Sequence, residues 1–134
     1  MKYVGLLVSS IGVFLVILAN FYYNSVTLDM QKIKEYVVES NIILEDVVKK
    51  EEYVIEKKDE YISRLVTLKK GINNSHTTFL INDYKEYKIK SINSLIQSIS
   101  EYENKEISLE EVNKYNGLCN EEIDKLIVNR ILYR

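Results

Sequence analysis

The sequence lacks the residues from which cross-linked folds and many small-protein sites are built. Its 134 residues include no proline, no tryptophan, four glycines, one cysteine and one histidine. A disulfide framework needs pairs of cysteines, and a structural zinc site needs about four cysteine or histidine ligands, so the sequence excludes both. The absence of proline removes the strongest local barrier to long, unbroken helices.

Charge is missing from the first part of the chain. All but one of the 38 Asp, Glu, Lys and Arg residues lie at or beyond Asp29, the exception being Lys2. Residues 4–23 are nearly continuous apolar sequence, and a helix of that length spans ~30 Å, the thickness of the hydrocarbon core of a bilayer. The run ends in three aromatic residues, 21–23, which suit a membrane interface. Residues 1–28 are therefore predicted to be a membrane anchor.

The charges that flank this segment predict its orientation. Lys2 and the free amino terminus lie on one side, and Asp29 and a slightly acidic remainder lie on the other. The positive-inside tendency then places the N-terminus in the cytoplasm and residues 29–134 outside it. We expect a single-pass protein of a bacterial cell envelope, because Lys, Ile, Asn, Glu and Tyr, all encoded by A/T-rich codons, are abundant together. No segment carries the basic face that nucleic-acid binding requires.

A cleaved secretory signal is the alternative interpretation of the first segment. Signal peptides have apolar cores of ~7–15 residues that end at a small-x-small cleavage site. Here the run is longer, and the one plausible site, after Ala19, has Ile17 where a small residue is usual. The sequence favours an uncleaved anchor and leaves the cleaved signal open. In both cases the rest of the chain leaves the cytoplasm.

Small residues within the anchor recur at spacings of three and four. Such spacing places them on one helical face, and small residues let two membrane helices approach closely. This face is a candidate for self-association or for packing against the helix of a partner, although small residues are also simply common in membrane helices. Its members are Gly5, Ser9, Gly12, Val16 and Ala19.

Beyond the anchor, apolar residues follow a helical period. Steps of three and four predict one helix over about 29–70, with a kink or a change of partner near 49–52 and Gly71 as its C-cap. The predicted buried stripe is Met30, Ile33, Val37, Ser40, Leu44, Val47, Glu51, Val54, Lys58, Tyr61, Leu65, Leu68 and Ile72.

Two further helices are predicted over about 77–104 and 109–131, the last opened by a capping box from Ser108 to Glu111. The apolar side of the second is Phe79, Leu80, Tyr84, Tyr87, Ile92, Leu95, Ile96, Ile99 and Tyr102. That of the third is Leu109, Val112, Tyr115, Cys119, Ile123, Leu126, Ile127 and Ile131. Short connections make consecutive helices antiparallel. The predicted fold class is all-α: an N-terminal transmembrane helix followed by a long helical hairpin or a three-helix antiparallel bundle.

Few side chains are candidates for catalysis, metal binding or cross-linking. His76 lies in a polar turn with no second imidazole nearby, so we interpret it as a surface residue. Cys119 lies on an apolar helix face, which favours a buried side chain. An unpaired thiol in an exported domain is also a candidate for an intermolecular disulfide. No carboxylate pair stands out from an ordinary charged helix surface. The sequence predicts no catalytic residue, no cofactor and no metal site.

These observations favour a protein that binds other molecules rather than an enzyme. We expect a non-catalytic, single-span membrane protein whose exported helical bundle makes protein–protein contacts at the cell envelope. Its expected partners are the lipid bilayer and either another protein or a second copy of the chain, with no small-molecule substrate. The alternative is a helical binding, immunity or exclusion module that is secreted or held at the cell surface after cleavage of a signal.

Overall fold

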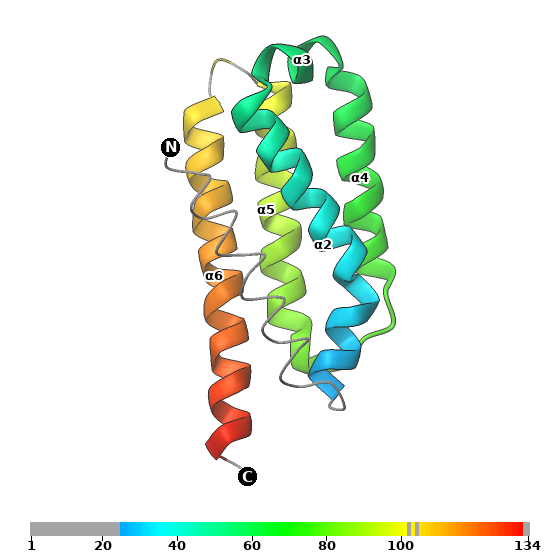
Figure 1. Ribbon diagram of the computed structural model, residues 1–134, viewed down its shortest axis with the longest axis vertical. Helices are drawn as coiled ribbons and strands as arrows, with labels where there is room; N and C mark the ends of the chain where they lie inside the picture. Colours follow the sequence, from blue (N-terminus) through cyan, green and yellow to red (C-terminus); the bar gives the residue numbers. More distant parts are fainter. Residues whose placement is uncertain (1–24, 102, 104, 133–134) are drawn as a thin grey trace.

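The computed structural model describes residues 25–101, 103 and 105–132, and this part of the chain is all-helical, without strands (Figure 1). Side-chain surroundings are described within residues 28–126. The predicted all-α class is confirmed. The elements, in chain order, are α2 (Ser25–Lys49), α3 (Glu51–Glu56), α4 (Lys58–Asn74), η1 (Phe79–Ile81), α5 (Asn82–Ser100) and α6 (Lys105–Leu132).

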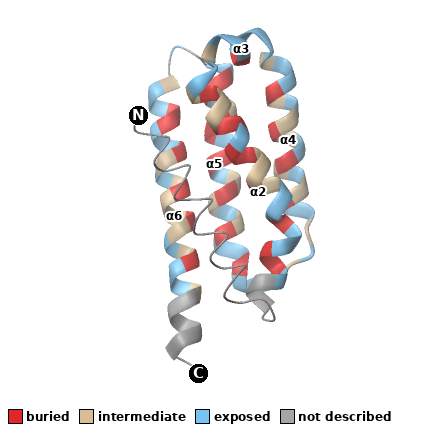
Figure 2. Cartoon of the chain, in the orientation of Figure 1, coloured by how far each residue is buried: buried red, intermediate tan, exposed pale blue. Residues whose placement is uncertain are grey.

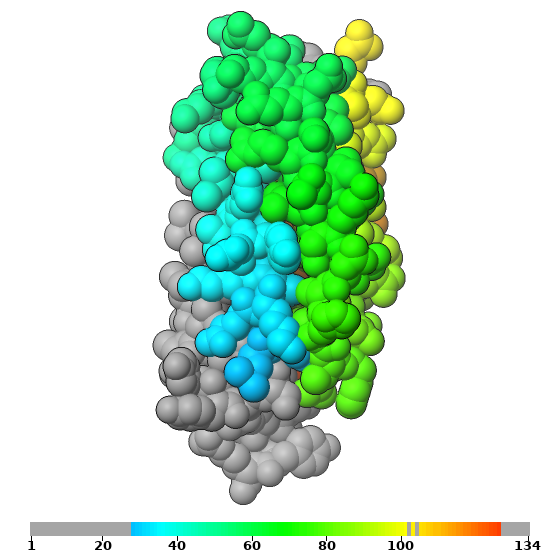
Figure 3. Space-filling model, turned by 90° about the vertical axis from the view of Figure 1, so that its right-hand side faces the viewer, coloured from blue at the N-terminus to red at the C-terminus, as the bar shows by residue number. Residues whose placement is uncertain are grey.

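The four long helices, α2, α4, α5 and α6, alternate in direction, so each is antiparallel to the next (Figure 1). We call the end where α2 begins the near end; η1 also lies there. We call the opposite end, which carries α3 and the first turn of α6, the far end. Helix α4 packs between α2 and α5, and α5 makes its most extensive contact with α6. Figure 3 shows α2 and α4 side by side along one face.

The single helix predicted over 29–70 is wrong, because the chain turns back on itself. The backbone leaves helical geometry at Lys50 (φ −125°, ψ 46°) and again at Lys57 (φ −109°, ψ 32°). Helix α3 occupies the reversal, so the irregularity expected near 49–52 is a change of direction rather than a kink. The described fold is therefore a bundle of four long helices, not a hairpin or a three-helix bundle.

The reversal has a simple physical cause. A straight helix of this length would leave much of its apolar stripe without a partner, whereas the hairpin packs the two arms of the stripe against each other. Glu51 and Lys58, the two charged positions of the stripe, lie at the reversal and are only partly buried. The other eleven predicted positions are buried: Met30, Ile33, Val37, Ser40, Leu44, Val47, Val54, Tyr61, Leu65, Leu68 and Ile72.

Helix boundaries further along the chain also differ from the predictions. Helix α6 begins at Lys105, so Ser108 lies inside it, is buried, and does not start a capping box. Phe79 and Leu80 form η1 rather than the apolar side of a helix, and both are exposed. The Thr78 hydroxyl caps that turn by accepting a hydrogen bond from the Leu80 N–H at 3.4 Å.

Gly71 is not a helix C-cap. Helix α4 continues through it to Asn74, and no glycine of the described residues has a positive φ. A Cβ atom at Gly71 would lie 2.5 Å from Cε1 of Tyr36 on α2. Glycine is therefore needed here for the close approach of a tyrosine ring, not for left-handed backbone geometry.

The hydrophobic core is divided into two clusters, and Figure 2 shows buried residues recurring along the four long helices. Burying each large apolar side chain contributes ~1.5–3 kcal/mol. The far cluster is Ile43, Leu44, Val47, Val54, Tyr61, Leu65, Leu68, Ile72, Ile92, Leu95, Ile99, Leu109 and Val112. The near cluster is Met30, Ile33, Val37, Ile81, Tyr84, Cys119 and Ile123.

The predicted membrane helix over residues 4–23 falls outside the part of the chain that the structure describes. Its candidate packing face, Gly5, Ser9, Gly12, Val16 and Ala19, does so as well. None of the described helices is both long enough and apolar enough to cross a membrane.

Candidate functional site

A layer of polar side chains lies between the two hydrophobic clusters. Along α2, α5 and α6, these residues fall between the positions that contribute to the near cluster and those that contribute to the far cluster. All of them are buried. They are Ser40, Asn41, Lys88, Ser91 and Asn116.

Hydrogen bonds in this polar layer join α5 to α6. Lys88 Nζ donates to Asn116 Oδ1 at 2.9 Å, and Ser91 Oγ donates to the same oxygen at 2.8 Å. On α2, Ser40 Oγ donates to the Val37 carbonyl at 2.7 Å, whereas Asn41 Nδ2 is buried without a partner. A shared acceptor of this kind favours one register of α5 against α6, because sliding either helix would leave buried polar atoms unpaired.

Lys88 is the most unusual member of the layer, since its side chain is only 1% exposed. Burial lowers the pKa of its ammonium, and the nearby Cys119 thiol opposes that shift. No carboxylate in the described part of the chain forms an ion pair with Lys88; its hydrogen bond is with the neutral Asn116 amide. The layer thus contains a buried lysine whose described hydrogen-bond partner is an amide oxygen rather than a carboxylate.

Cys119 lies beside this layer in the near cluster and is fully buried. Its Sγ donates a weak hydrogen bond to the Tyr84 carbonyl at 3.8 Å. Burial raises the pKa of the thiol, and burial likewise raises the pKa of the Tyr84 phenol. The thiolate needed for redox chemistry is disfavoured in this position. An intermolecular disulfide through Cys119 stays a prediction, and it would require α6 to separate from the bundle.

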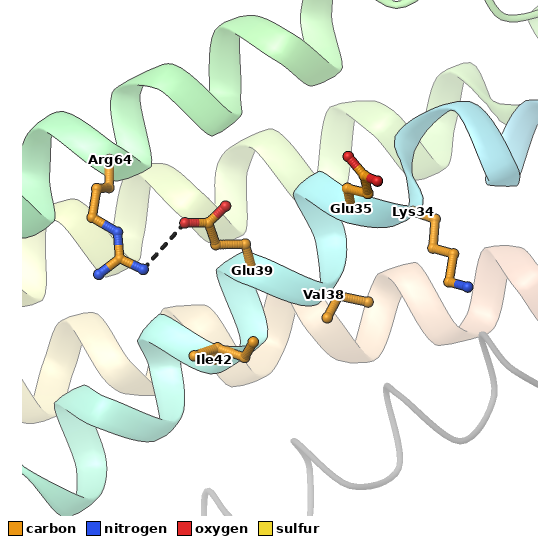
Figure 4. Close-up of a pocket in the computed structure, with 6 residues that line it drawn as sticks. All are labelled: Lys34, Glu35, Val38, Glu39, Ile42 and Arg64. Atoms are coloured by element: carbon orange, nitrogen blue, oxygen red, sulfur yellow. Dashed lines mark hydrogen bonds and ion pairs between the residues drawn. The ribbon is translucent and has the colours of Figure 1, made fainter.

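An open groove of about 460 Å³ lies on the outer face of α2 (Figure 4). Five of its residues, Lys34, Glu35, Val38, Glu39 and Ile42, come from α2, and Arg64 reaches across from α4. Arg64 Nη2 pairs with Glu39 Oε1 at 3.1 Å. The groove has no nucleophile and no histidine, and no residue of the polar layer lines it.

A neutral buried amine can act as a nucleophile when a substrate reaches it. Lys88 borders neither the α2 groove nor the ~10 Å³ cavity at the far end, which is lined by Glu51, Ile55 and Lys105 among others. Among the described residues, no group of three or more His, Cys, Asp and Glu side chains could hold a metal ion. This arrangement supports a structural role for the polar layer.

His76 lies where the sequence places it, in the exposed turn between α4 and η1. Its carbonyl accepts a hydrogen bond from Lys32 Nζ at 2.7 Å. Close by, the Asp29 carboxylate accepts from the Thr78 N–H, at 3.0 Å and 3.1 Å to its two oxygens, and from the Thr78 hydroxyl. These contacts hold the turn against the first residues of α2. The sequence did not single out Asp29, because its partner is 49 residues away.

Lys88 and Asn116 were also missed, although a sequence signal existed. Lys88 is four residues after Tyr84 and four before Ile92, which places it in the middle of the apolar face of α5. Asn116 similarly lies between Val112 and Cys119 on α6. A polar residue at a core position of a helical period is a signal for a buried polar pair.

Six of the seven exposed large apolar side chains in the described part of the chain lie at the two ends of the bundle, and the seventh, Ile42, lies in the α2 groove. Leu28, Phe79 and Leu80 lie at the near end. Tyr53 and Ile55 on α3, with Ile107 on the first turn of α6, lie at the far end, where Lys105 Nζ and Glu51 Oε1 join the two elements at 2.7 Å. Solvent-exposed apolar groups of this kind are typical of binding surfaces.

At a significant level the sequence matches no protein-family model, no curated protein and no solved structure.

Proposed function

We propose that this chain is a non-catalytic, single-span membrane protein whose exported helical bundle binds another protein at the cell envelope. Residues 4–23 form the membrane anchor in this proposal, with the N-terminus in the cytoplasm. The polar layer keeps the helices in register, and the ends of the bundle make the contacts with the surroundings.

The exposed apolar side chains at the far end are the main support for the proposed binding function. Three large apolar side chains, Tyr53, Ile55 and Ile107, are exposed there rather than packed into the far cluster. The surrounding sequence, residues 50–60 and 101–106, contains eight acidic and four basic side chains. An apolar centre with a charged rim is the usual anatomy of a protein–protein interface. The partner that fits has a basic surface around an apolar patch.

The buried polar groups are better explained as structural than as catalytic. Lys88 is enclosed and bonded to Asn116, and burial raises the pKa of the Cys119 thiol. General acid–base or covalent catalysis requires such groups to meet a substrate in a cavity. The open α2 groove contains an ion pair instead, between Arg64 and Glu39. These observations support a binding protein over an enzyme.

Site-specific photocrosslinking in native membranes tests this proposal. A photoreactive amino acid at Ile107 reports on the far end, and the same group at the exposed Lys114, two turns further along α6, is the matched control. We expect an adduct with another protein from position 107 and little from 114. An adduct with a second copy of the chain would support self-association and contradict a basic partner. The absence of any adduct from either position would contradict the binding function.

Membrane attachment is tested separately by fractionation. We expect the full chain, with an intact mass that retains Met1, to stay in the membrane pellet after an alkaline carbonate wash. A mature chain that begins after Ala19 and appears in the soluble fraction would support the secreted module instead. Because the two experiments have different readouts, the binding function and the anchor can fail independently.

A further inference from the structure

Three apolar side chains from distant parts of the sequence are exposed together at the near end. Phe79 is 79% exposed, Leu28 51% and Leu80 40%. Phe79 and Leu80 project from η1, while Leu28 lies near the start of α2. Exposing a phenylalanine to this extent costs free energy in water, so such a group is typical of a contact surface.

Polar contacts fix the position of these side chains. Asp29, next to Leu28, accepts hydrogen bonds from the backbone and the hydroxyl of Thr78, next to Phe79. Lys85 Nζ, on α5, donates to the Ser75 carbonyl at 3.2 Å and to Thr77 Oγ1 at 2.9 Å. The turn and the start of α2 therefore form one rigid surface rather than a loose loop.

We propose that this near-end apolar group, Leu28, Phe79 and Leu80, inserts into the interfacial layer of the lipid bilayer. The inference rests on the proposed membrane anchor and adds a second contact between the same chain and the same membrane. The contact would hold the bundle upright, with α3 directed away from the lipid and available to a partner.

The segment between the apolar run and Leu28 is short, which keeps the near end close to the bilayer. Leu28 lies only five positions after Tyr23, the last aromatic residue of the apolar run. Five residues extend ~7.5 Å as a helix and at most ~17 Å fully extended. The headgroup region adds ~5–8 Å on each side of the hydrocarbon core. Because α2 begins at Ser25, most of this path is helical. If residues 4–23 span the bilayer, the near end therefore lies at or just above the headgroups.

The distribution of charge favours the same orientation. Near-end sequence, residues 25–35, 69–86 and 121–132, contains seven acidic and seven basic side chains, against eight acidic and four basic at the far end. Anionic lipid repels the acidic far end more strongly than the near end, where the charges balance. Phenylalanine and leucine are the side chains that interfacial segments bury among the headgroups.

The absence of tryptophan makes a direct test possible. The full-length Phe79→Trp variant has a single tryptophan at the near end, and Tyr53→Trp is the matched control at the far end. Each is reconstituted into vesicles that contain anionic and zwitterionic lipids, with and without brominated acyl chains. We expect the emission of F79W to shift to shorter wavelength and to be quenched severalfold more by brominated lipid than that of Y53W.

The outcomes separate this inference from the proposed anchor. A chain that floats with the vesicles, but whose F79W emission resembles that of tryptophan in water, would overturn the lipid contact and leave the anchor standing. Emission that is shifted but not quenched would mean that protein covers Phe79, and it would also overturn the lipid contact. A chain that does not float with the vesicles would overturn both proposals. Leu80→Trp is the second reporter, and it should behave as F79W does.

Discussion

The two halves of the bundle differ in how many buried apolar side chains the described residues contribute. The far cluster draws on α2, α3, α4, α5 and α6 and contains thirteen buried residues. Among the residues whose side chains are described, the near cluster contains seven, none of them from α4. At the near end, polar contacts supplement this smaller core: Asp29 holds Thr78, and Lys32 and Lys85 hold carbonyls of the turn. Polar contacts also join elements of the far half, for example Tyr61 with Asp46 and Lys105 with Glu51. The two halves therefore differ in the size of the described apolar cluster rather than in the presence of hydrogen bonds.

This difference bears on the two proposed contact surfaces, one at each end of the bundle. Apolar packing does not depend on the relative orientation of the packed groups. A large apolar cluster can therefore support the short α3 and the exposed residues that it carries. Hydrogen bonds are directional, so the near-end contacts position a specific turn and the three apolar residues beside it. The polar layer around Lys88 lies at the border between the two halves.

The largest expected effect comes from the far cluster. Leu65 is fully buried there, so Leu65→Ala should lower the free energy of unfolding by ~2–5 kcal/mol through lost apolar burial and a residual cavity. Chemical denaturation followed by circular dichroism measures the change. The control Ile107→Ala removes an exposed side chain and should stay within ~0.5 kcal/mol. Equal losses in both variants would remove the basis for calling the far half the packed one.

The near-end contacts give the next effect. Asp29→Ala removes the acceptor of the Thr78 N–H and hydroxyl, and we expect a loss of ~1–3 kcal/mol because these donors are left unpaired. Native-state hydrogen exchange should quicken in the turn and at the start of α2, not in the far cluster. Asp124→Ala, at an exposed position on α6, is the matched control. Faster exchange throughout the bundle would show that the two halves open as one unit.

Two glycines should respond in opposite directions. A Cβ atom at Gly71 would lie 2.5 Å from the Tyr36 ring, so Gly71→Ala should cost ~1–2 kcal/mol through overpacking. A Cβ atom at Gly117, on α6, would meet nothing within 4 Å, so Gly117→Ala should gain ~0.5–1 kcal/mol through helix propensity. Thermal unfolding compares the pair. A gain at both positions would mean that Tyr36 moves aside without cost.

The polar layer should show the smallest effect and a distinct pH dependence. Lys88→Met replaces a buried cation with an apolar side chain of similar length, and we expect ~1 kcal/mol of added stability at pH 7. Because burial lowers the pKa of Lys88, the unfolded chain binds more protons between that pKa and about 10.4, and wild-type stability gains over this window as pH rises. The advantage of the variant should therefore shrink toward pH 10.

Denaturation at several pH values, analysed as the difference between wild type and Lys88→Met, isolates this group from the others that titrate in the same range. The raised pKa of the Cys119 thiol acts in the opposite direction and cancels in the difference to the extent that its surroundings are unchanged. A variant that is less stable than wild type at every pH would show that Asn116 fully compensates the buried cation.

Much of the helical pattern could be predicted from the sequence. Spacing alone identifies the stripe from Met30 to Ile72, because helical periodicity is a local property of the sequence. The apolar members of the stripe are buried, as predicted. Tyr84, Ile92, Leu95 and Ile99 are likewise correctly placed on the inner side of α5. Phe79 and Leu80 are not on that inner side. They form a short 3-10 turn just before the helix, and apolar spacing does not distinguish such a turn from the first turn of the helix.

The reversal at Lys50 could not be predicted as a reversal. No proline or glycine marks it, and a stripe packed against itself has the same spacing as a stripe along a straight helix. Gly71 was misassigned for a related reason: a glycine near a helix end suggests a cap, while the need for space beside Tyr36 depends on a residue 35 positions earlier. The sequence showed where a break could occur, through Glu51 and Lys58, but not what the chain does there.

Local spacing was thus sufficient to assign helices, their inner faces and a charge-free first segment, because each depends on residues within a few turns of one another. Contacts between distant segments decided the rest. They determined that the first long stripe folds back through α3, that Lys88 meets Asn116 inside the core, and that Asp29 holds the turn carrying Phe79. Such pairings follow from the free energy of the whole packed bundle, in which apolar area must be covered and every buried donor needs an acceptor.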